Sequence, residues 1–167
     1  KLIDIRKAAK RASELTRQML AYTGKSTLST EIIDLNSLID EMSSLFDISI
    51  SKKVKISYIL DYNVPCISGD PTQISQILMN LVLNASEAIE NNGEIKISTS
   101  LKECNTAEID SLVLSNNMTE GTYLILEISD NGSGIPQDKI KQIYDPFYTT
   151  KFTGRGLGLA AVSGIIR

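Results

Sequence analysis

The sequence predicts a two-layer α/β (α+β) sandwich in which helices cover one face of a mixed β-sheet, preceded by one long helix. β-prone runs alternate with long amphipathic helices, but without the strict strand–helix–strand rhythm of a doubly wound sheet. The 167 residues fit one domain with a short appendage. Apolar residues make up 42% of the chain and charged residues 22%. This composition suffices for a buried core and excludes disorder of the whole chain.

The composition also excludes several kinds of site. The chain contains no histidine, which excludes Ser-His-Asp and Cys-His nucleophiles and His-based zinc sites within it. The formal charge is −3 and aromatic residues make up only 5%, so we expect no nucleic acid partner. Cys66 and Cys104 lack metal-ligand spacing and fit a reducing compartment. We expect a cytoplasmic location, with any membrane anchor outside this chain, because no apolar run approaches the roughly 18 residues of a span.

Residues 1–24 predict a long helix with an apolar seam, ended by Gly24 as a C-cap glycine. The seam residues recur at spacings of three and four: Leu2, Ile5, Ala9, Ala12, Thr16 and Met19. The small alanines favour a helical bundle or dimer stalk over the alternative, an amphipathic helix packed on its own domain. We therefore expect residues 1–25 to form a unit of their own and residues 26–167 to form the main domain.

Three elements come next, a short strand at 31–35, a helix over 36–50 and a strand over 53–60. Pro65 and Gly69 then mark a loop. Asp70 has the position of an N-cap and Pro71 that of the first helical residue. A long helix is therefore expected to begin there and to run to about residue 90.

The second half of the chain predicts a strand over 94–100, a polar insertion over 102–121, a strand over 123–130, a short helix over 137–144, an irregular segment over 145–155 and a final helix over 156–167. Period-two alternation places Leu124, Leu126, Ile128 and Asp130 on one face of the 123–130 strand. The insertion carries no motif that indicates a function.

Gln76, Asn80 and Asn84 stand four residues apart in the long helix and form a row of amides along one face, opposite an apolar stripe. Asparagine is a mediocre helix former, so a merely solvated face would more readily use Glu, Lys or Gln. Amide oxygens can complete a magnesium shell beside water and phosphate oxygens. A solvated face is the alternative interpretation of this row.

Asp130 continues the aliphatic row of its strand and opens the turn DNGSGI, residues 130–135. A carboxylate at the end of a buried face needs a donor, and the exocyclic amine of a purine is one candidate. Gly132 and Gly134 would let the backbone lie close against a flat ring. The alternative is an ordinary Asn-Gly turn in which Asp130 accepts backbone N–H groups.

A glycine-rich cluster, TTKFTGRGLGLAAV at residues 149–162, precedes the final helix. Gly154, Gly156 and Gly158 alternate there beside Lys151 and Arg155. Free backbone N–H groups, a helix N-terminus and cations together suit a polyphosphate. The spacing is not that of a P-loop, and a Rossmann unit cannot be completed at this position. The alternative is a flexible loop that caps a helix.

Taken in order, these clusters resemble the ATP-binding domain of sensor histidine kinases, within the GHKL group that includes gyrase and the MutL mismatch-repair proteins. Four boxes carry the resemblance: QISQILMNLVLNASEAI (73–89), DNGSGI (130–135), DPFYTTK (145–151) and GRGLGLAAV (154–162). They look like the family's asparagine, first glycine, phenylalanine and second glycine boxes. Residues 31–42 are similar to the segment that opens this domain, and residues 8–24 to the second helix of the dimerisation and histidine-transfer domain. The resemblance implies the GHKL, or Bergerat, ATP-binding fold.

The resemblance also implies roles for individual residues toward ATP and Mg²⁺. Asn84 would bind the magnesium ion, Asn80 would contact metal-bound water or phosphate, and Asp130 would bond the adenine amine. Lys151 and Arg155 would lie at the phosphates and act, with Asn80, as the catalytic residues. The other residues expected to line the site are Gly132, Gly134, Ile135, Phe147, Thr150, Gly154, Gly156, Leu157 and Gly158.

By the same resemblance, the activity would be that of a protein histidine kinase, which transfers the γ-phosphoryl group of ATP to a histidine and onward to an aspartate of a response regulator receiver domain. We expect the acceptor histidine upstream of residue 1 and further strands beyond residue 167, so the fragment should not phosphorylate itself. The N-terminal helix would join two copies of the intact protein. Glu87 departs from the pattern, because many relatives carry Lys or Arg there, and one phosphate contact would be missing.

Two other functions stay open at this point. One is a GHKL ATPase of the gyrase or MutL type, which would typically place a glutamate at the position of Asn80. An amide cannot take the proton that hydrolysis by a general base requires. The other is a dimeric interaction module with a degenerate nucleotide site.

Overall fold

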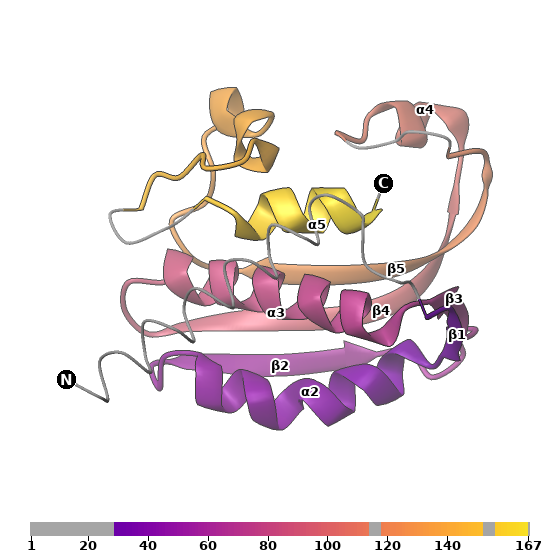
Figure 1. Ribbon diagram of the computed structural model, residues 1–167, viewed down its shortest axis with the longest axis horizontal. Coiled ribbons are helices and arrows are strands. Elements are labelled where there is room, and N and C mark those ends of the chain that lie inside the picture. Colours follow the sequence, from indigo (N-terminus) through magenta and orange to yellow (C-terminus); the bar gives the residue numbers. More distant parts are fainter. Residues whose placement is uncertain (1–28, 114–117, 152–155, 167) are drawn as a thin grey trace.

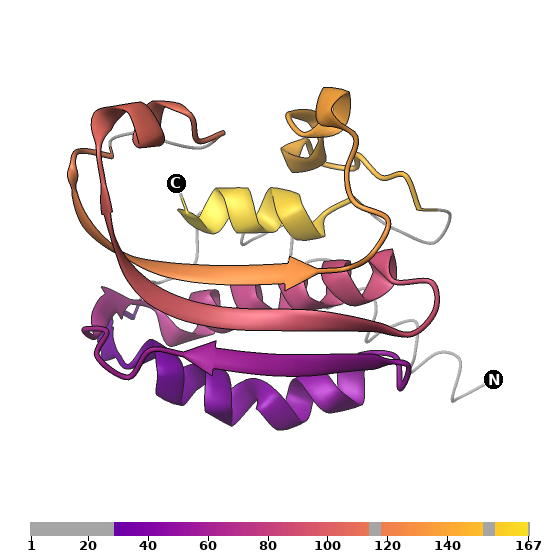
Figure 2. The same cartoon turned by 180° about the vertical axis from the view of Figure 1, so that it is seen from behind.

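The computed structural model describes residues 29–113, 118–151 and 156–166. Three strands form the main sheet, β2 (Val54–Leu60), β4 (Gly93–Cys104) and β5 (Gly121–Asp130). Three helices lie side by side on one face of it, α2 (Leu35–Ser49), α3 (Pro71–Ala88) and α5 (Gly158–Ile166) (Figure 1). Seen from behind in Figure 2, no helix of the described residues covers the other face. The predicted two-layer sandwich is confirmed.

The sheet is mixed, as expected. Its order is β2-β4-β5, with β2 parallel to β4 and β4 antiparallel to β5. A parallel neighbour requires a crossover connection, and the segment between β2 and β4 supplies it with α3. The register pairs Ile56 with Ile95, and Ile95 in turn with Asp130.

A second, two-stranded sheet was only half predicted. β1 (Glu31–Ile33) pairs antiparallel with β3 (Ile67–Gly69), where the sequence indicated a loop. Each strand leads directly into a helix through an aspartate N-cap. Asp34 accepts hydrogen bonds from the N–H groups of Asn36 and Ser37, and Asp70 those of Thr72 and Gln73. The predicted start of α3 at Asp70 and Pro71 is confirmed.

The core lies between the sheet and helices α2 and α3. Its fully buried side chains are Phe46, Ile39, Leu78, Ile95, Ile97 and Val82. Leu124, Leu126 and Ile128 of β5 pack against it, as the period-two pattern predicted. The aliphatic side of α3 therefore faces the core.

A buried polar network ties the start of α2 to the ends of two strands. The Asn36 Nδ2 group donates to the carbonyl oxygen of Asp61 over 2.9 Å, and the Thr99 hydroxyl donates to Asn36 Oδ1 over 2.8 Å. The Asp61 N–H donates to Thr99 Oγ1 over 3.1 Å. Asn36 and Thr99 are both buried. These bonds therefore offset the free-energy cost of removing their polar groups from water.

Several predicted elements differ in detail from the structure. The β4–β5 ladder extends to Cys104 and Gly121, so part of the predicted insertion is strand, and its tip carries α4 (Thr106–Asp110). The predicted helix over 137–144 consists of two 3₁₀ turns, η1 (Gln137–Lys139) and η2 (Gln142–Tyr144). The helix expected over residues 1–24 lies outside the described residues. Within the described ranges, no helix combines the length and apolarity needed to cross a membrane.

Replacing Thr99 with valine tests the buried network. The variant keeps the shape of the side chain but leaves Asn36 Oδ1 without its donor, while the Asp61 N–H keeps the carbonyl oxygen of residue 99 at 3.3 Å. We expect the free energy of unfolding to fall by about 1–3 kcal/mol, measured by urea denaturation. Thr122→Val, at an exposed threonine of β5, is the matched control and should change stability little. Equal stability of the two variants would contradict the role given to the network.

Candidate functional site

Helix α3 presents its amide row to α5. Asn80 is buried and Asn84 half-buried, which excludes the solvated-face interpretation for Asn80. Gly158, the first residue of α5, lies directly over the pair: a Cβ atom built on it would stand 3.5 Å from Asn84 Nδ2 and 3.7 Å from Asn80 Oδ1. The structure thus brings together residues of two boxes that the family resemblance assigned to one site, and their roles toward a nucleotide stay predictions.

Both amides carry a buried polar group without a partner. Within the described residues, Asn80 Nδ2 and Asn84 Nδ2 are buried and form no hydrogen bond. Such a group costs about 1–3 kcal/mol in a folded protein, so two adjacent ones beneath a helix N-terminus indicate a polar ligand. An Nδ2 group can donate to phosphate oxygen or water, and rotation of the amide would present Oδ1 to a cation instead.

The same two residues fit a magnesium ion that is held mainly by phosphate. In the part of the chain that the structure describes, no three His, Cys, Asp or Glu side chains gather as metal ligands. Magnesium usually keeps several waters and takes few protein ligands beside substrate phosphates. One amide oxygen from Asn84, supported by Asn80, suits that pattern.

The DNGSGI turn lies against the C-terminal end of α3. The Ser133 N–H donates to the carbonyl oxygen of Ala88 over 3.0 Å, and a Cβ on Gly132 would stand only 2.5 Å from the same oxygen. Only glycine therefore fits at position 132 without a backbone shift. Asp130 is exposed at the end of β5, and its Oδ1 accepts the Gly132 N–H over 2.8 Å.

One polar residue of this turn was missed from the sequence. Asn131 Oδ1 accepts the Glu94 N–H over 2.9 Å and so fastens the turn to the start of β4. Gly134 has a φ of 70°, with open space where a Cβ would be, and Ile135 is half exposed. The first half of the turn is therefore held in place, whereas its second half is open to solvent. One of the two carboxylate oxygens of Asp130 accepts a backbone N–H group within the turn, which is the alternative role considered for this residue.

The segment over residues 145–151 is fastened to the start of α5. The Phe147 N–H donates to the carbonyl oxygen of Gly156 over 2.7 Å, and a Cβ on Gly156, at φ 64°, would stand 2.4 Å from the Phe147 carbonyl carbon. Phe147 itself has a φ of 68° and is largely exposed. Thr150 is exposed, whereas Leu157 is buried and anchors α5. Gly154 and Arg155 lie outside the described residues.

Lys151 has a different neighbour from the one expected. Its Nζ atom is 2.8 Å from Glu87 Oε2 and 3.3 Å from the carbonyl oxygen of Asn84. The structure thus brings Lys151 to the backbone of Asn84, the predicted metal ligand, but the ammonium group of Lys151 pairs with the carboxylate of Glu87. The expected contact of Lys151 with phosphate stays a prediction.

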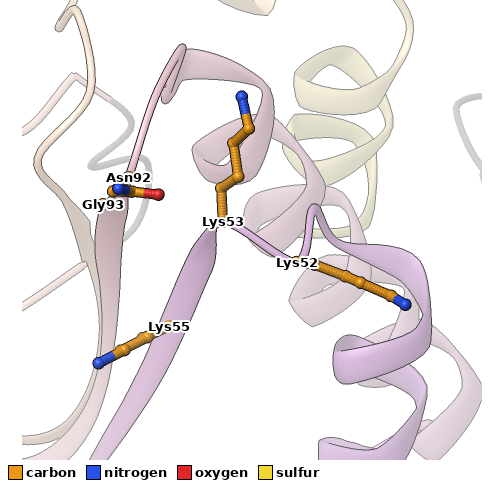
Figure 3. Close-up of a pocket in the computed structure, with 5 residues that line it drawn as sticks. All are labelled: Lys52, Lys53, Lys55, Asn92 and Gly93. Atoms are coloured by element: carbon orange, nitrogen blue, oxygen red, sulfur yellow. The ribbon is translucent and has the colours of Figure 1, made fainter.

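A separate pocket of about 480 Å³ lies where β2 and β4 begin. It is lined by Lys52, Lys53, Lys55, Asn92 and Gly93. Figure 3 shows that the three lysine side chains point away from one another rather than toward a common point. The pocket therefore provides no converging charges for a ligand, and the α3 site is the stronger candidate.

A family model matches the part of the chain that carries the candidate site. Residues 69–167, which include Asn80, Asn84 and Asp130, match the family model of histidine kinase-, DNA gyrase B-, and HSP90-like ATPases. Sensor kinase CckA of Brucella abortus (strain 2308) is 32% identical over 169 residues, which cover 99% of this chain and 18% of CckA. The chain therefore spans less than a fifth of that relative's length.

Solved structures give the same result for the fold. The catalytic domain of histidine kinase ThkA is 31% identical with a TM-score of 0.62, and the match covers 84% of this chain and 80% of that one. ThkA in complex with response regulator protein TrrA is 26% identical with a TM-score of 0.61, covering 87% of this chain and 39% of that one. The expected fold is confirmed, and the chain belongs to the histidine kinase-, DNA gyrase B-, and HSP90-like ATPase family.

Proposed function

We propose that this chain is the ATP-binding catalytic part of a two-component sensor histidine kinase. The observation that carries the proposal concerns Asn80 and Asn84 beneath the first turn of α5: their Nδ2 atoms are buried and have no hydrogen-bond partner among the described residues. Family membership supports ATP as the ligand, and the relatives named as histidine kinases support the kind of activity.

In this proposal the nucleotide lies between α3 and the two glycine segments. Asp130 accepts a hydrogen bond from the adenine amine, and Gly132 and Gly134 leave room for the ring. The phosphates point toward Gly156 and Gly158 at the start of α5, where free N–H groups and the helix dipole favour negative charge.

Magnesium would be held by Asn84 Oδ1, with Asn80 bonded to metal-bound water or a phosphate oxygen. When bound, the ion supplies charge neutralisation at the phosphates. The amides contribute position: α3 holds both residues beneath the start of α5, and an amide acts neither as an acid nor as a base at neutral pH.

The acceptor must come from outside these 167 residues, since they contain no histidine. An imidazole nitrogen forms a bond to the γ-phosphorus while the bond from that phosphorus to the β–γ bridging oxygen breaks, and ADP leaves. Such transfer relies on positioning and electrostatics, which suits a site of amides and glycines. An amide at position 80 disfavours the hydrolytic alternative, because it cannot activate water as a base.

The second transfer would pass the phosphoryl group to an aspartate of a response regulator receiver domain. The complex of ThkA with response regulator protein TrrA supports a partner of this kind. We also propose a domain boundary near residue 25 and the pairing of two copies through residues 1–24. The proposed location is cytoplasmic, next to any membrane anchor.

Asp130→Asn tests the adenine contact. The new amide still has an oxygen to accept the Gly132 N–H, so the turn is preserved, but the charge-assisted bond to the adenine amine is lost. We expect ATP affinity to weaken by about 1.5–3 kcal/mol and the preference for ATP over GTP to shrink, measured by calorimetry. Asp138→Asn, an exposed aspartate of η1, is the control. Unchanged affinity for both nucleotides would rule the contact out.

Asn84→Ala tests the metal ligand. The gain in ATP affinity that Mg²⁺ provides should fall by about 10–100-fold, as at other metal sites that lose a supporting side chain. Binding of ADP without metal should change little. Gln76→Ala, at the other end of the same row of amides, is the matched control. A magnesium titration identical in wild type and Asn84→Ala would contradict the assignment.

Labelling with ATP carrying a radioactive γ-phosphate tests the source of the acceptor. The isolated chain should gain no acid-labile phosphoryl group even when it binds ATP, because it has no imidazole. A histidine-containing helical fragment of a related kinase, added in trans, should become labelled instead. Acid-labile label on the isolated chain would overturn this expectation.

A further inference from the structure

The last turn of α3 carries a charge that its position disfavours. Glu87 lies in that turn, and α3 has no basic residue there, although the C-terminal end of a helix favours cations. Lys151 supplies the missing cation from 64 positions further along the chain. Its Nζ atom bonds Glu87 Oε2 over 2.8 Å and the carbonyl oxygen of Asn84 over 3.3 Å.

This contact connects α3 to the start of α5 through one short segment. Lys151 ends the segment 145–151, and Phe147 within it holds Gly156 through a 2.7 Å hydrogen bond. Gly156 leads through buried Leu157 to Gly158, which lies over the two unpaired amides. The position of the segment 145–151 therefore affects the position of Gly156 and Gly158 over the candidate site.

Phe147 gives a reason why the segment needs such a fastening. Its φ of 68° lies in the left-handed region, which a bulky residue rarely adopts without support from its surroundings. Its side chain is 64% exposed, so packing of the ring supplies little of that support. Two contacts hold the segment to its neighbours, the hydrogen bond of Phe147 to Gly156 and that of its last residue, Lys151, to Glu87.

We propose that Glu87 is a positioning residue of the nucleotide site: through Lys151 it holds the segment 145–151 against α3, and Lys151 serves as this tether and not as a phosphate ligand. The inference rests on the proposed nucleotide binding. The competing role is that Lys151 leaves Glu87 for the γ-phosphate, in which case Glu87 competes with ATP for the ammonium group.

The two roles predict opposite effects of Glu87→Gln. A tether predicts weaker binding of ATP and ADP alike, by about threefold, the scale of one exposed ion pair. Lys151→Met should then have the same effect, and the double variant should be no weaker than either single one. A phosphate contact predicts tighter ATP binding in Glu87→Gln and an ATP-selective loss in Lys151→Met.

Limited proteolysis in the absence of nucleotide tests whether the ion pair holds the segment, independently of whether the protein binds ATP. Chymotrypsin cleaves after aromatic residues, so Phe147 and Tyr148 report on the segment, and neither substitution alters these sites. We expect both single variants to be cut there about threefold faster than wild type. Combining Glu87→Lys with Lys151→Glu restores the ion pair in reverse and should slow the cut again. The controls are Glu90→Gln, at an exposed glutamate, and Lys139→Met, at a half-buried lysine that pairs with Asp138 and not with Glu87.

Wild-type cleavage rates in both single variants, or tighter ATP binding in Glu87→Gln, would overturn the tether. Absence of nucleotide binding in the wild-type protein would instead overturn the proposed function, while faster cleavage in the variants would still support the fastening of the segment by Glu87.

Discussion

Helix α3 is packed on two sides, between the core and α5, and this packing orients the candidate site. Leu78 and Val82 are fully buried in the core against the sheet, and this burial sets the rotation of the helix about its axis. The rotation in turn places Asn80 and Asn84 under the first turn of α5. An aliphatic core on one side thus orients polar groups on the other, and the Nδ2 atoms of both asparagines are buried there.

The C-terminal end of α3 then becomes the reference point for the site. The last carbonyl groups of a helix have no partners within it. The carbonyl oxygen of Ala88, the last residue of α3, accepts the N–H of Ser133, and the carbonyl oxygen of Asn84, one turn earlier, accepts the ammonium group of Lys151. The last two turns of this one helix therefore hold both the turn after β5 and the segment 145–151 before α5.

The sheet register explains why the turn after β5 meets this helix end. β4 begins at Gly93, five residues after α3 ends at Ala88, and Asp130 pairs with Ile95 near the start of β4. The residues that follow Asp130 must consequently emerge beside the end of α3. Any slip of this register by one residue would turn Asp130 to the opposite face of the sheet.

Features that depend on neighbouring residues in the chain could be predicted from the sequence. Asp70 and Pro71 set the start of α3, because the capping side chain bonds N–H groups two and three residues away. Alternation predicted the face of Leu124, Leu126 and Ile128. The ordered boxes assigned Asn80, Asn84 and Gly158 to one candidate site, and the structure brings these three residues together.

Contacts between residues far apart in the chain could not be predicted in this way and follow from the three-dimensional fold. The pairing of β1 with β3, the network of Asn36 with Thr99, and the ion pair of Glu87 with Lys151 all lie between segments more than thirty positions apart. No local pattern marks such partners. Three-residue strands carry little periodicity, and a single charge on a helix surface is compatible with many neighbours. Which neighbour it meets follows from the register of the sheet and the rotation of packed helices, and these are properties of the whole fold.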